Sequence, residues 1–239
     1  MSNNLDSSDS LNKLAGVVIL AGGASQRMGS PKALLTLPTD ERLLDYHVRQ
    51  AAQLNVPIMI ADNGREFAVD VKLLASNPEL SITQIDDYQS ISIVDNDKAE
   101  ATQGPLVAIE SALQNLNNAR DVNLEHKQSW LLVISCDSLI NAQQLWQQLN
   151  DYNDTDIDDN EDKSVLCLTD DSHLYPLLGL YRLSIEPALR AYIDSGERKV
   201  MSFIKPIAQT VPVLEKQQLL TNFNTPTDFK RACSALYDL

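Results

Sequence analysis

The chain has 239 residues, of which 44% are hydrophobic, and its formal net charge at pH 7 is −14. This length suits one α/β domain or at most two small ones, and the hydrophobic content is enough for an ordinary core. The strong negative charge argues against non-specific binding to nucleic acid or to an anionic membrane. A polyanionic ligand would therefore have to meet a few local cations, backbone N–H groups or a metal ion.

Strands and helices are predicted to alternate along most of the chain, because buried apolar runs alternate with apolar residues at helical spacing. Residues 1–13 are rich in Ser and Asn and are expected to be a disordered tail. The elements that follow are predicted in this order: strand 16–21, helix 41–55, strand 56–62, helix 65–76, strand 90–95, helix 104–116, strand 130–137 and helix 142–152. Beyond an acid-rich segment come strands 164–168 and 175–183 and helices 185–196 and 226–237.

This alternation predicts an α/β fold, a single domain with a mostly parallel, Rossmann-like sheet and helices on both faces. The acid-rich segment 151–163 lacks the glycine and the terminal glutamate of an EF-hand. We therefore expect a solvated surface loop there rather than a cation site.

Cysteine usage and the N-terminal sequence favour a reducing, cytoplasmic location. The three cysteines, Cys136, Cys167 and Cys233, are far apart and form no CxxC pair, so neither a disulfide framework nor a zinc site is indicated. The first residues lack the basic and apolar regions of a secretory signal. No apolar run approaches the roughly 18 residues of a membrane span. We expect a monomer with neither a membrane nor a nucleic-acid partner.

The segment VVILAGGASQRMGSPKALL (17–35) carries the strongest functional signal. Its spacing matches neither the P-loop, GxxxxGK[ST], nor the dinucleotide fingerprint, GxGxxG. Its glycines nevertheless let backbone N–H groups approach an anion closely, and Arg27 and Lys32 add two cations nearby. We interpret the segment as a phosphate-binding loop; the alternative is a plain turn with a surface arginine and lysine.

The stretch LAGGASQRMGSPKALL (20–35) resembles the loop LAGGxSxRMGxxKxLL of nucleotidyltransferases, and it is most similar to that of the molybdenum cofactor guanylyltransferases. Four further segments resemble this family in the expected order: GPLVAIESAL (104–113), SCDSL (135–139), YPLLGLY (175–181) and NFNTPTDF (222–229). The resemblance runs from residue 16 to residue 230 and implies one nucleotidyltransferase domain over 14–239. The chain departs from the family where Ser135 and Leu139 replace proline and where Tyr175 replaces histidine, which leaves the second substrate less defined.

The resemblance implies transfer of GMP from GTP to molybdopterin, with release of pyrophosphate and with Mg²⁺ as the cofactor. It also implies contacts with other proteins of molybdenum cofactor biosynthesis or with acceptor proteins. A phosphate monoester has a second pKa near ~6, so the attacking phosphate is anionic at neutral pH and needs no strong general base. Positioning and neutralisation of charge would then carry the reaction.

Three residues form the predicted catalytic set. Asp137 follows a buried strand and is the expected magnesium ligand, because magnesium takes one or two carboxylates together with phosphates and water. The alternative for Asp137 is an N-cap of the next helix. Lys32 and Arg27 are expected to contact the nucleotide phosphates; the alternatives are a surface lysine and an arginine that ties the loop down.

The predicted ligand-binding residues are, by resemblance, mostly at the carboxyl ends of strands, where such sheets bind ligands. The nucleotide would be contacted by the backbone of the glycine loop, by the start of a helix and by two side chains that read guanine or ribose: Leu20, Ala21, Gly22, Gly23, Gly104, Asn63 and Asp95. Asp97 is an alternative to Asp95, and Asn63 is equally explained as part of a turn. Asn222 and Asn224 would complete the metal and pterin side, or else form only a cap and turn before Pro226.

Two rival functions stay open. In the same fold, the chain could be a molybdopterin cytidylyltransferase or a sugar-phosphate nucleotidyltransferase; Gly22 and Gly23 favour the guanylyl branch, because cytidylyl relatives more often read LAAG. In a different class, it could be a non-catalytic relative that binds nucleotide or cofactor and delivers it. Other tempting residues are expected to be structural: His47, Cys136, Trp130 and Trp146.

Overall fold

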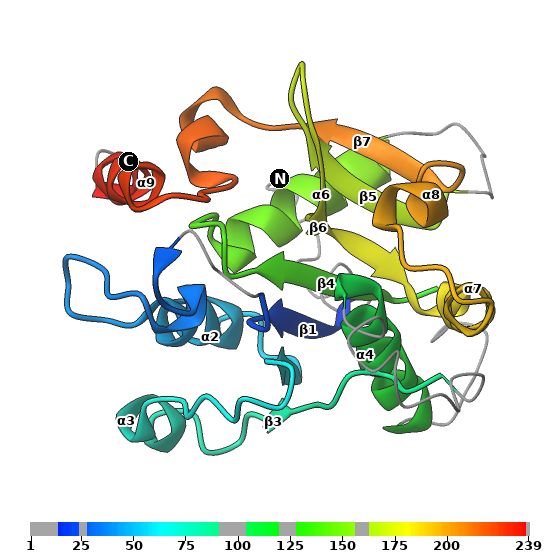
Figure 1. Cartoon of the computed structure of the whole chain (residues 1–239), viewed down its shortest axis with the longest axis horizontal. Helices are drawn as coiled ribbons and strands as arrows, with labels where there is room; N and C mark the ends of the chain where they lie inside the picture. Colours follow the sequence, from blue (N-terminus) through cyan, green and yellow to red (C-terminus); the bar gives the residue numbers. More distant parts are fainter. Residues whose placement is uncertain (1–13, 24–27, 91–103, 120–127, 156–162, 238–239) are drawn as a thin grey trace, which may run out of the picture.

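The computed structural model describes residues 14–23, 28–90, 104–119, 128–155 and 163–237. Seven strands form one sheet in the order β3-β2-β1-β4-β6-β5-β7 (Figure 1). Strand β6 is antiparallel to β4 and β5, and the other neighbouring pairs are parallel, so the prediction of a mostly parallel sheet is confirmed. The strands are β1 (Leu14–Leu20), β2 (Ile58–Ala61), β3 (Ile82–Gln84), β4 (Trp130–Ser135), β5 (Val165–Thr169), β6 (Leu174–Arg182) and β7 (Ala208–Pro212).

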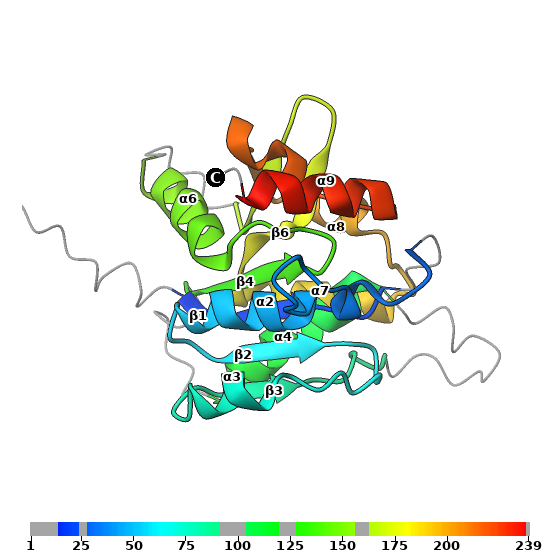
Figure 2. The ribbon, with the colours of Figure 1, turned by 90° about the vertical axis from the view of Figure 1, so that its left-hand side faces the viewer.

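Helices cover both faces of the sheet, and the sheet separates the core into two clusters. The described α-helices are α2 (Leu43–Ala52), α3 (Val71–Ala75), α4 (Pro105–Ala119), α6 (Ala142–Thr155), α7 (Glu186–Asp194), α8 (Val200–Ile204) and α9 (Pro226–Tyr237). Short 3-10 helices occur at η2 (Lys32–Leu34), η4 (Leu183–Ile185) and η5 (Glu215–Leu220). Figures 1 and 2 both place β3 and α3 at one end of the sheet and α9 toward the other.

The central strand β1 supplies side chains to both core clusters. Its residues are all buried: Val17 and Ile19 pack in the cluster that contains α2, α6 and α9, and Val18 and Leu20 pack in the cluster that contains α4, α7 and α8. Successive side chains of a strand point to opposite faces of the sheet, so a strand covered on both faces is apolar throughout. This is why the continuous run at 16–21 was a sound indicator of a central strand.

The helix predicted over 65–76 was too long, because the chain forms a turn first. The Asp62 carboxylate accepts hydrogen bonds from the backbone N–H groups of Arg65 at 3.2 Å and Phe67 at 2.7 Å. An aspartate that binds the backbone ahead of it in this way stabilises a turn instead of a helix. Only α3, five residues long, remains of the predicted helix.

Several short elements were not predicted. Strand β3 precedes the strand predicted at 90–95, and residues 91–95 lie outside the described residues. Edge strands β3 and β7, helix α8 and η5 are short and carry mixed polar and apolar residues, so they lack a clear periodic signal. Helix α6 continues to Thr155 and includes the start of the acid-rich segment, whose residues 156–162 are not described.

The core confirms the structural roles expected for the aromatic and sulfur side chains. Trp130, Trp146 and His47 are buried, and all three cysteines are buried free thiols. Within the described ranges, every helix is too short or too polar to serve as a membrane span.

Candidate active site

The site lies at the carboxyl edge of the sheet, between β1 and β4. The chain continues from β1 to β2 on one side, and β4 lies on the other side of β1, so the strand order reverses here. Loops diverge at such a point and leave a crevice for ligands. The backbone N–H of Cys136 donates to the carbonyl of Leu20 at 3.0 Å, which keeps the starts of the two loops side by side. A cavity of about 360 Å³ opens at this place.

Many of the predicted residues line this cavity, although they come from four separate segments. They are Leu20, Gly22, Gly23, Asn63, Gly104 and Asp137. Ala21 does not line it: its side chain is buried and its backbone N–H donates to the carbonyl of Ala61 at 2.8 Å. Asn222 is exposed outside the cavity lining. Arg27, Asp95 and Asp97 lie outside the described residues.

The two glycines of the loop have different neighbours. A Cβ atom on Gly22 would lie 3.0 Å from Cβ of Asn63, whereas a Cβ on Gly23 would meet no atom within 4 Å. Asn63 itself has a left-handed backbone with φ of 60°. Gly22 is therefore required for close packing of the loop against the turn after β2, and Gly23 leaves open space beside the cavity.

An arginine that the sequence analysis missed holds this loop. Nη1 of Arg65 donates to the carbonyl of Gly23 at 3.0 Å. Arg65 lies in the turn after β2, in a segment that was predicted to be the start of a helix. No local pattern marks it, because its partner lies 42 positions away in the chain.

Lys32 joins two other segments at the edge of the cavity. Its ammonium donates to Oδ1 of Asn224 at 2.9 Å and lies 3.6 Å from Oδ2 of Asp137. The ammonium also lies 5.7 Å from the centre of the Phe223 ring, and the backbone N–H of Phe223 donates to the carbonyl of Asp137 at 2.8 Å. The side chains of Lys32 and Asp137 keep 15% and 29% of their exposure, enough to meet a ligand.

Two buried side chains of α2 contact the backbone of the loop that carries Asp137. Nε2 of His47 lies 2.9 Å from the carbonyl of Ser138, and the hydroxyl of Tyr46 donates to the carbonyl of Leu139 at 2.9 Å. Burial lowers the pKa of His47 to about 4, so its imidazole is neutral at pH 7 and Nε2–H is the donor. His47 is thus a structural support of the site and not a general base.

The cap of helix α6 is Asn141 and not Asp137. Oδ1 of Asn141 accepts hydrogen bonds from the backbone N–H groups of Gln143 and Gln144 at 2.8 and 3.2 Å, which is the usual N-cap arrangement. The capping alternative for Asp137 is therefore wrong. Cys136, next to it, is buried, and burial raises the pKa of its thiol, so it stays protonated as expected for a structural cysteine.

Asp87 also lines the cavity and was missed by the sequence analysis. Burial raises the pKa of its carboxyl group, and the charges of Asp86 and Asp62 raise it further. Asp87 follows β3, a strand that was not predicted. Residues 91–95 lie outside the described residues, so the strand predicted at 90–95 and the role of Asp95 stay predictions.

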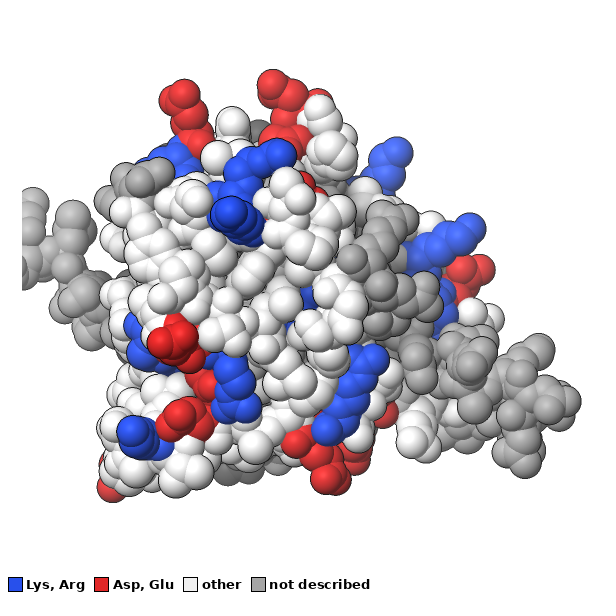
Figure 3. All heavy atoms as spheres, turned by 60° about the vertical axis from the view of Figure 1, so that its left-hand side comes forward, with Lys and Arg blue, Asp and Glu red and all other residues white. Residues whose placement is uncertain are grey.

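Among the described residues, the face on which the cavity opens shows no large block of one charge. In Figure 3, where the side to which β1 and β4 point comes forward, blue and red side chains surround a broad uncharged area. Among the described residues, no cluster of three or more His, Cys, Asp or Glu side chains is suited to hold a metal ion. A metal ion here would depend on Asp137 and ligand oxygens, and magnesium commonly binds through one or two carboxylates with phosphates and water.

Comparisons with known proteins identify a family model and several relatives that match most of the chain. Residues 17–212 match the family model described as "MobA-like NTP transferase domain". The chain is 26% identical to a "Probable molybdenum cofactor guanylyltransferase" of Carboxydothermus hydrogenoformans, over 90% of this chain and 93% of that protein. It is 24% identical to a "Molybdenum cofactor guanylyltransferase" of Vibrio atlanticus, over 88% of this chain and 91% of that protein.

Among solved structures, the molybdopterin-guanine dinucleotide biosynthesis protein A of Archaeoglobus fulgidus has a similar fold. The TM-score is 0.62 at 20% sequence identity, and the match covers 94% of this chain and 100% of that chain. At this identity the likeness establishes the fold alone.

Proposed function

Because the chain belongs to the MobA-like NTP transferase domain family, we propose that it transfers GMP from GTP to the terminal phosphate of molybdopterin and releases pyrophosphate. The observation that carries the proposal is the position of Lys32, between Asp137 and Asn224 at the edge of a cavity walled by the glycine loop. These three residues come from distant segments of the chain. Together they place one cation and two oxygen atoms side by side at the edge of the cavity. Proteins with names that specify this transfer match nearly the whole chain.

The cavity offers complementary groups to the two ends of GTP. Guanine presents adjacent N1–H and N2–H donors, and a carboxylate accepts both. Asp87 and Asp137 are the lining carboxylates among the described residues, and Asp137 is already engaged by Lys32. We therefore assign Asp87 to the base, and Lys32 with the loop at Gly22 and Gly23 to the phosphates. Asp95 stays a prediction for the same role.

Charge neutralisation is the main task of the chain's own groups. Lys32 would stabilise negative charge on the phosphates as the bond to pyrophosphate breaks. Asp137 and Asn224 present oxygen atoms next to it and would hold Mg²⁺, which supplies further positive charge to the phosphates when bound. The Arg65 contact to Gly23 would keep the loop in position for in-line attack.

Two of the three departures from the family pattern are structural in this chain. Leu139 is buried, and its backbone N–H and carbonyl bind Leu220 and Tyr46. The hydroxyl of Tyr175 donates to the carboxylate of Asp170 in the β5–β6 hairpin. Only Ser135 faces the cavity. The changes at Leu139 and Tyr175 therefore leave the described cavity wall unaltered, whereas the change at Ser135 alters a residue that lines it.

By resemblance, Gly22 and Gly23 favour the guanylyl over the cytidylyl reaction, because cytidylyl relatives more often read LAAG. In this chain an alanine at position 22 would place its Cβ 3.0 Å from Cβ of Asn63, a tight contact in the cavity wall. We further propose that the reaction takes place in the cytoplasm, where the three buried free cysteines stay reduced. The protein is proposed to act as a monomer.

The proposal is tested by nucleotide selection and by product release. Thermal unfolding is measured with GTP, ATP, CTP or UTP in the presence of magnesium, and pyrophosphate release is then measured with molybdopterin. We expect GTP to raise the melting temperature most and to be the nucleotide consumed. Tighter binding of CTP would point to the cytidylyl reaction, and GTP binding without pyrophosphate release would point to a carrier protein.

A further inference from the structure

Asp87 lies in a weakly held part of the cavity wall. The strand before it, β3, has three residues, lies at the edge of the sheet and buries no side chain fully. The last sheet contact is the backbone N–H of Ile85, which donates to the carbonyl of Ile60 at 2.9 Å. Asp86 and Asp87 then repel each other and nearby Asp62, which contributes to the raised pKa of Asp87. A second anchor is needed to keep Asp87 facing the cavity.

Tyr88 is this anchor, and helices α4 and α7 hold it. Its backbone N–H donates to the carbonyl of Val107 in α4 at 3.1 Å. The Arg190 guanidinium of α7 lies over its ring, 5.6 Å from the ring centre. The Tyr88 hydroxyl lies 3.3 Å from both carboxylate oxygens of Asp194, and the Ser90 hydroxyl donates to Oδ1 of Asp194 at 2.6 Å.

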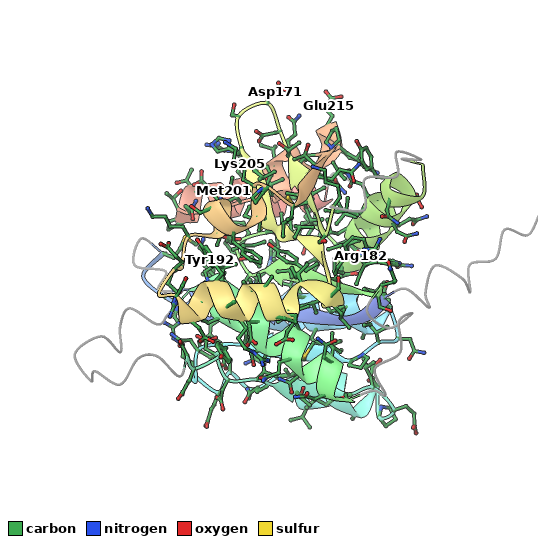
Figure 4. The ribbon with its side chains drawn as sticks, turned by 90° about the vertical axis from the view of Figure 1, so that its right-hand side faces the viewer. Asp171, Arg182, Tyr192, Met201, Lys205 and Glu215 are labelled. Atoms are coloured by element: carbon green, nitrogen blue, oxygen red, sulfur yellow. The ribbon has the colours of Figure 1, made fainter. Side chains whose placement is uncertain are left out.

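Arg190 and Asp194 are four residues apart and therefore share one face of α7. Figure 4 shows α7 lying across α4, with Tyr192 and Arg182 labelled near its two ends. Asp194 is the last residue of α7, where the helix dipole disfavours a carboxylate. The hydroxyl groups of Tyr88 and Ser90 offset that cost, so this carboxylate is tied to the segment that follows Asp87.

Arg190 is fixed by two further carboxylates. Its Nε donates to Oε1 of Glu110 in α4 at 3.0 Å, and its Nη2 forms an ion pair with Glu186 one turn earlier in α7. Glu110 is fully buried, and its Oε2 has no hydrogen-bond partner among the described residues. Burial raises the pKa of Glu110 to about 7, and the contact with Arg190 opposes this rise. Displacement of the guanidinium from its place over Tyr88 would therefore leave a buried carboxyl group without its ion-pair partner.

From these contacts we infer that Arg190 and Asp194 are positioning residues that set nucleobase selectivity, by holding Tyr88 and thereby fixing Asp87 in the cavity. The inference rests on the proposed function, since it assigns these residues to the guanine side of the same cavity. Neither residue lines the cavity, so both act through Asp87. Their loss would let Asp87 move away from the base while the phosphate contacts of Lys32 stay in place.

The test compares binding constants for GTP and ATP, with magnesium, in folded variants. Asp194→Ala removes the carboxylate without stranding a buried charge. Arg190→Leu is made together with Glu110→Gln, because the single change would leave Glu110 unpaired in the core. The matched control is Arg182→Leu, which removes an arginine stacked 4.0 Å from the Trp130 ring centre, at the other end of β4. Melting temperatures establish that each variant is folded.

We expect both test variants to lose about tenfold in selectivity for GTP over ATP, with little change in ATP binding, and the control to keep wild-type selectivity. Each variant is also combined with Asp87→Asn. If the α7 residues act through Asp87, the combined variants lose no more selectivity than Asp87→Asn alone. Arg190→Lys, which keeps a positive charge, should recover part of the selectivity.

The outcomes separate the inference from the proposed function. Unchanged selectivity in the folded α7 variants, or a loss that adds to that of Asp87→Asn, would overturn the inference and leave the function standing. A wild-type protein that does not prefer GTP would overturn both.

Discussion

Lys32 and Asn224 are separated by 192 positions in the chain, yet the Lys32 ammonium donates a hydrogen bond of 2.9 Å to Oδ1 of Asn224. The same ammonium lies 3.6 Å from Oδ2 of Asp137. One positive charge is therefore shared between a carboxylate and an amide oxygen. In the proposed reaction, phosphate groups take the donors of Lys32, and the two oxygens become available to a metal ion.

Asp137→Asn keeps the shape of the side chain and removes its charge. We expect turnover to fall by on the order of a hundredfold or more, because an electrostatic contact that is already in place is lost. The melting temperature should change little, since the backbone contacts of the loop to His47 and Phe223 remain. The control is Asp171→Asn in the β5–β6 hairpin, labelled in Figure 4. Normal turnover of folded Asp137→Asn protein would remove Asp137 from the catalytic set.

Lys32→Ala and Asp87→Asn test the two ends of the cavity. Lys32→Ala should weaken GTP and ATP alike, because Lys32 meets only phosphate. Asp87→Asn should weaken GTP far more than ATP, because a site that satisfies the guanine donors loses its acceptor. The measurement is the binding constant of each variant for GTP and for ATP, compared with the wild type. If Asp95→Asn reduces selectivity and Asp87→Asn does not, the base is read by Asp95.

Gly22→Ala and Gly23→Ala form a matched pair. The first places Cβ 3.0 Å from Asn63, and the second places Cβ in open space. We expect Gly22→Ala to lower the free energy of unfolding by about 1 to 3 kcal/mol through overpacking and to weaken GTP binding. Gly23→Ala should leave the free energy of unfolding nearly unchanged. Denaturation in urea measures both, and equal stabilities would show that the loop moves away from Asn63 without cost.

The buried His47 predicts a loss of stability in mild acid. Its pKa is lowered from 6.5 in the unfolded chain to about 4 in the folded protein. Between these values the unfolded chain binds a proton that the folded protein rejects. The free energy of unfolding is therefore unaffected by the titration of His47 above about pH 6.5. It decreases as the pH falls below that value, by about 3 kcal/mol once His47 is protonated in both the folded and the unfolded state.

The measurement is the free energy of unfolding in urea at a series of pH values from 7 to 4. His47→Gln keeps a donor for the carbonyl of Ser138 and does not titrate, so its decline should be shallower than that of the wild type. His173→Gln, at an exposed histidine of the β5–β6 hairpin, is the control and should follow the wild type. Parallel curves for the wild type and His47→Gln would mean that other groups cause the acid sensitivity.

Local sequence was sufficient for the central sheet and for one side of the site. The runs at β1 and β4 are buried throughout and almost entirely apolar because both faces of these strands are covered. Such a run can be identified without knowledge of its neighbours. The glycine loop, Lys32 and Asp137 follow from spacing within short segments. Their roles in binding and catalysis remain predictions, as do those of Arg27 and Asp95, which lie outside the described residues.

Only the tertiary structure decided which residues complete the wall of the cavity. Strand β3 is three residues long and partly polar, and it exists because its backbone pairs with β2, which no local pattern records. Asp87 enters the cavity through that pairing and through the contacts of Tyr88 with α4 and α7. The partners of Arg65, Lys32 and Arg190 likewise lie 42, 192 and 80 positions away. Sequence periodicity reports how each segment is buried, whereas the meeting of distant polar side chains depends on how the whole chain packs.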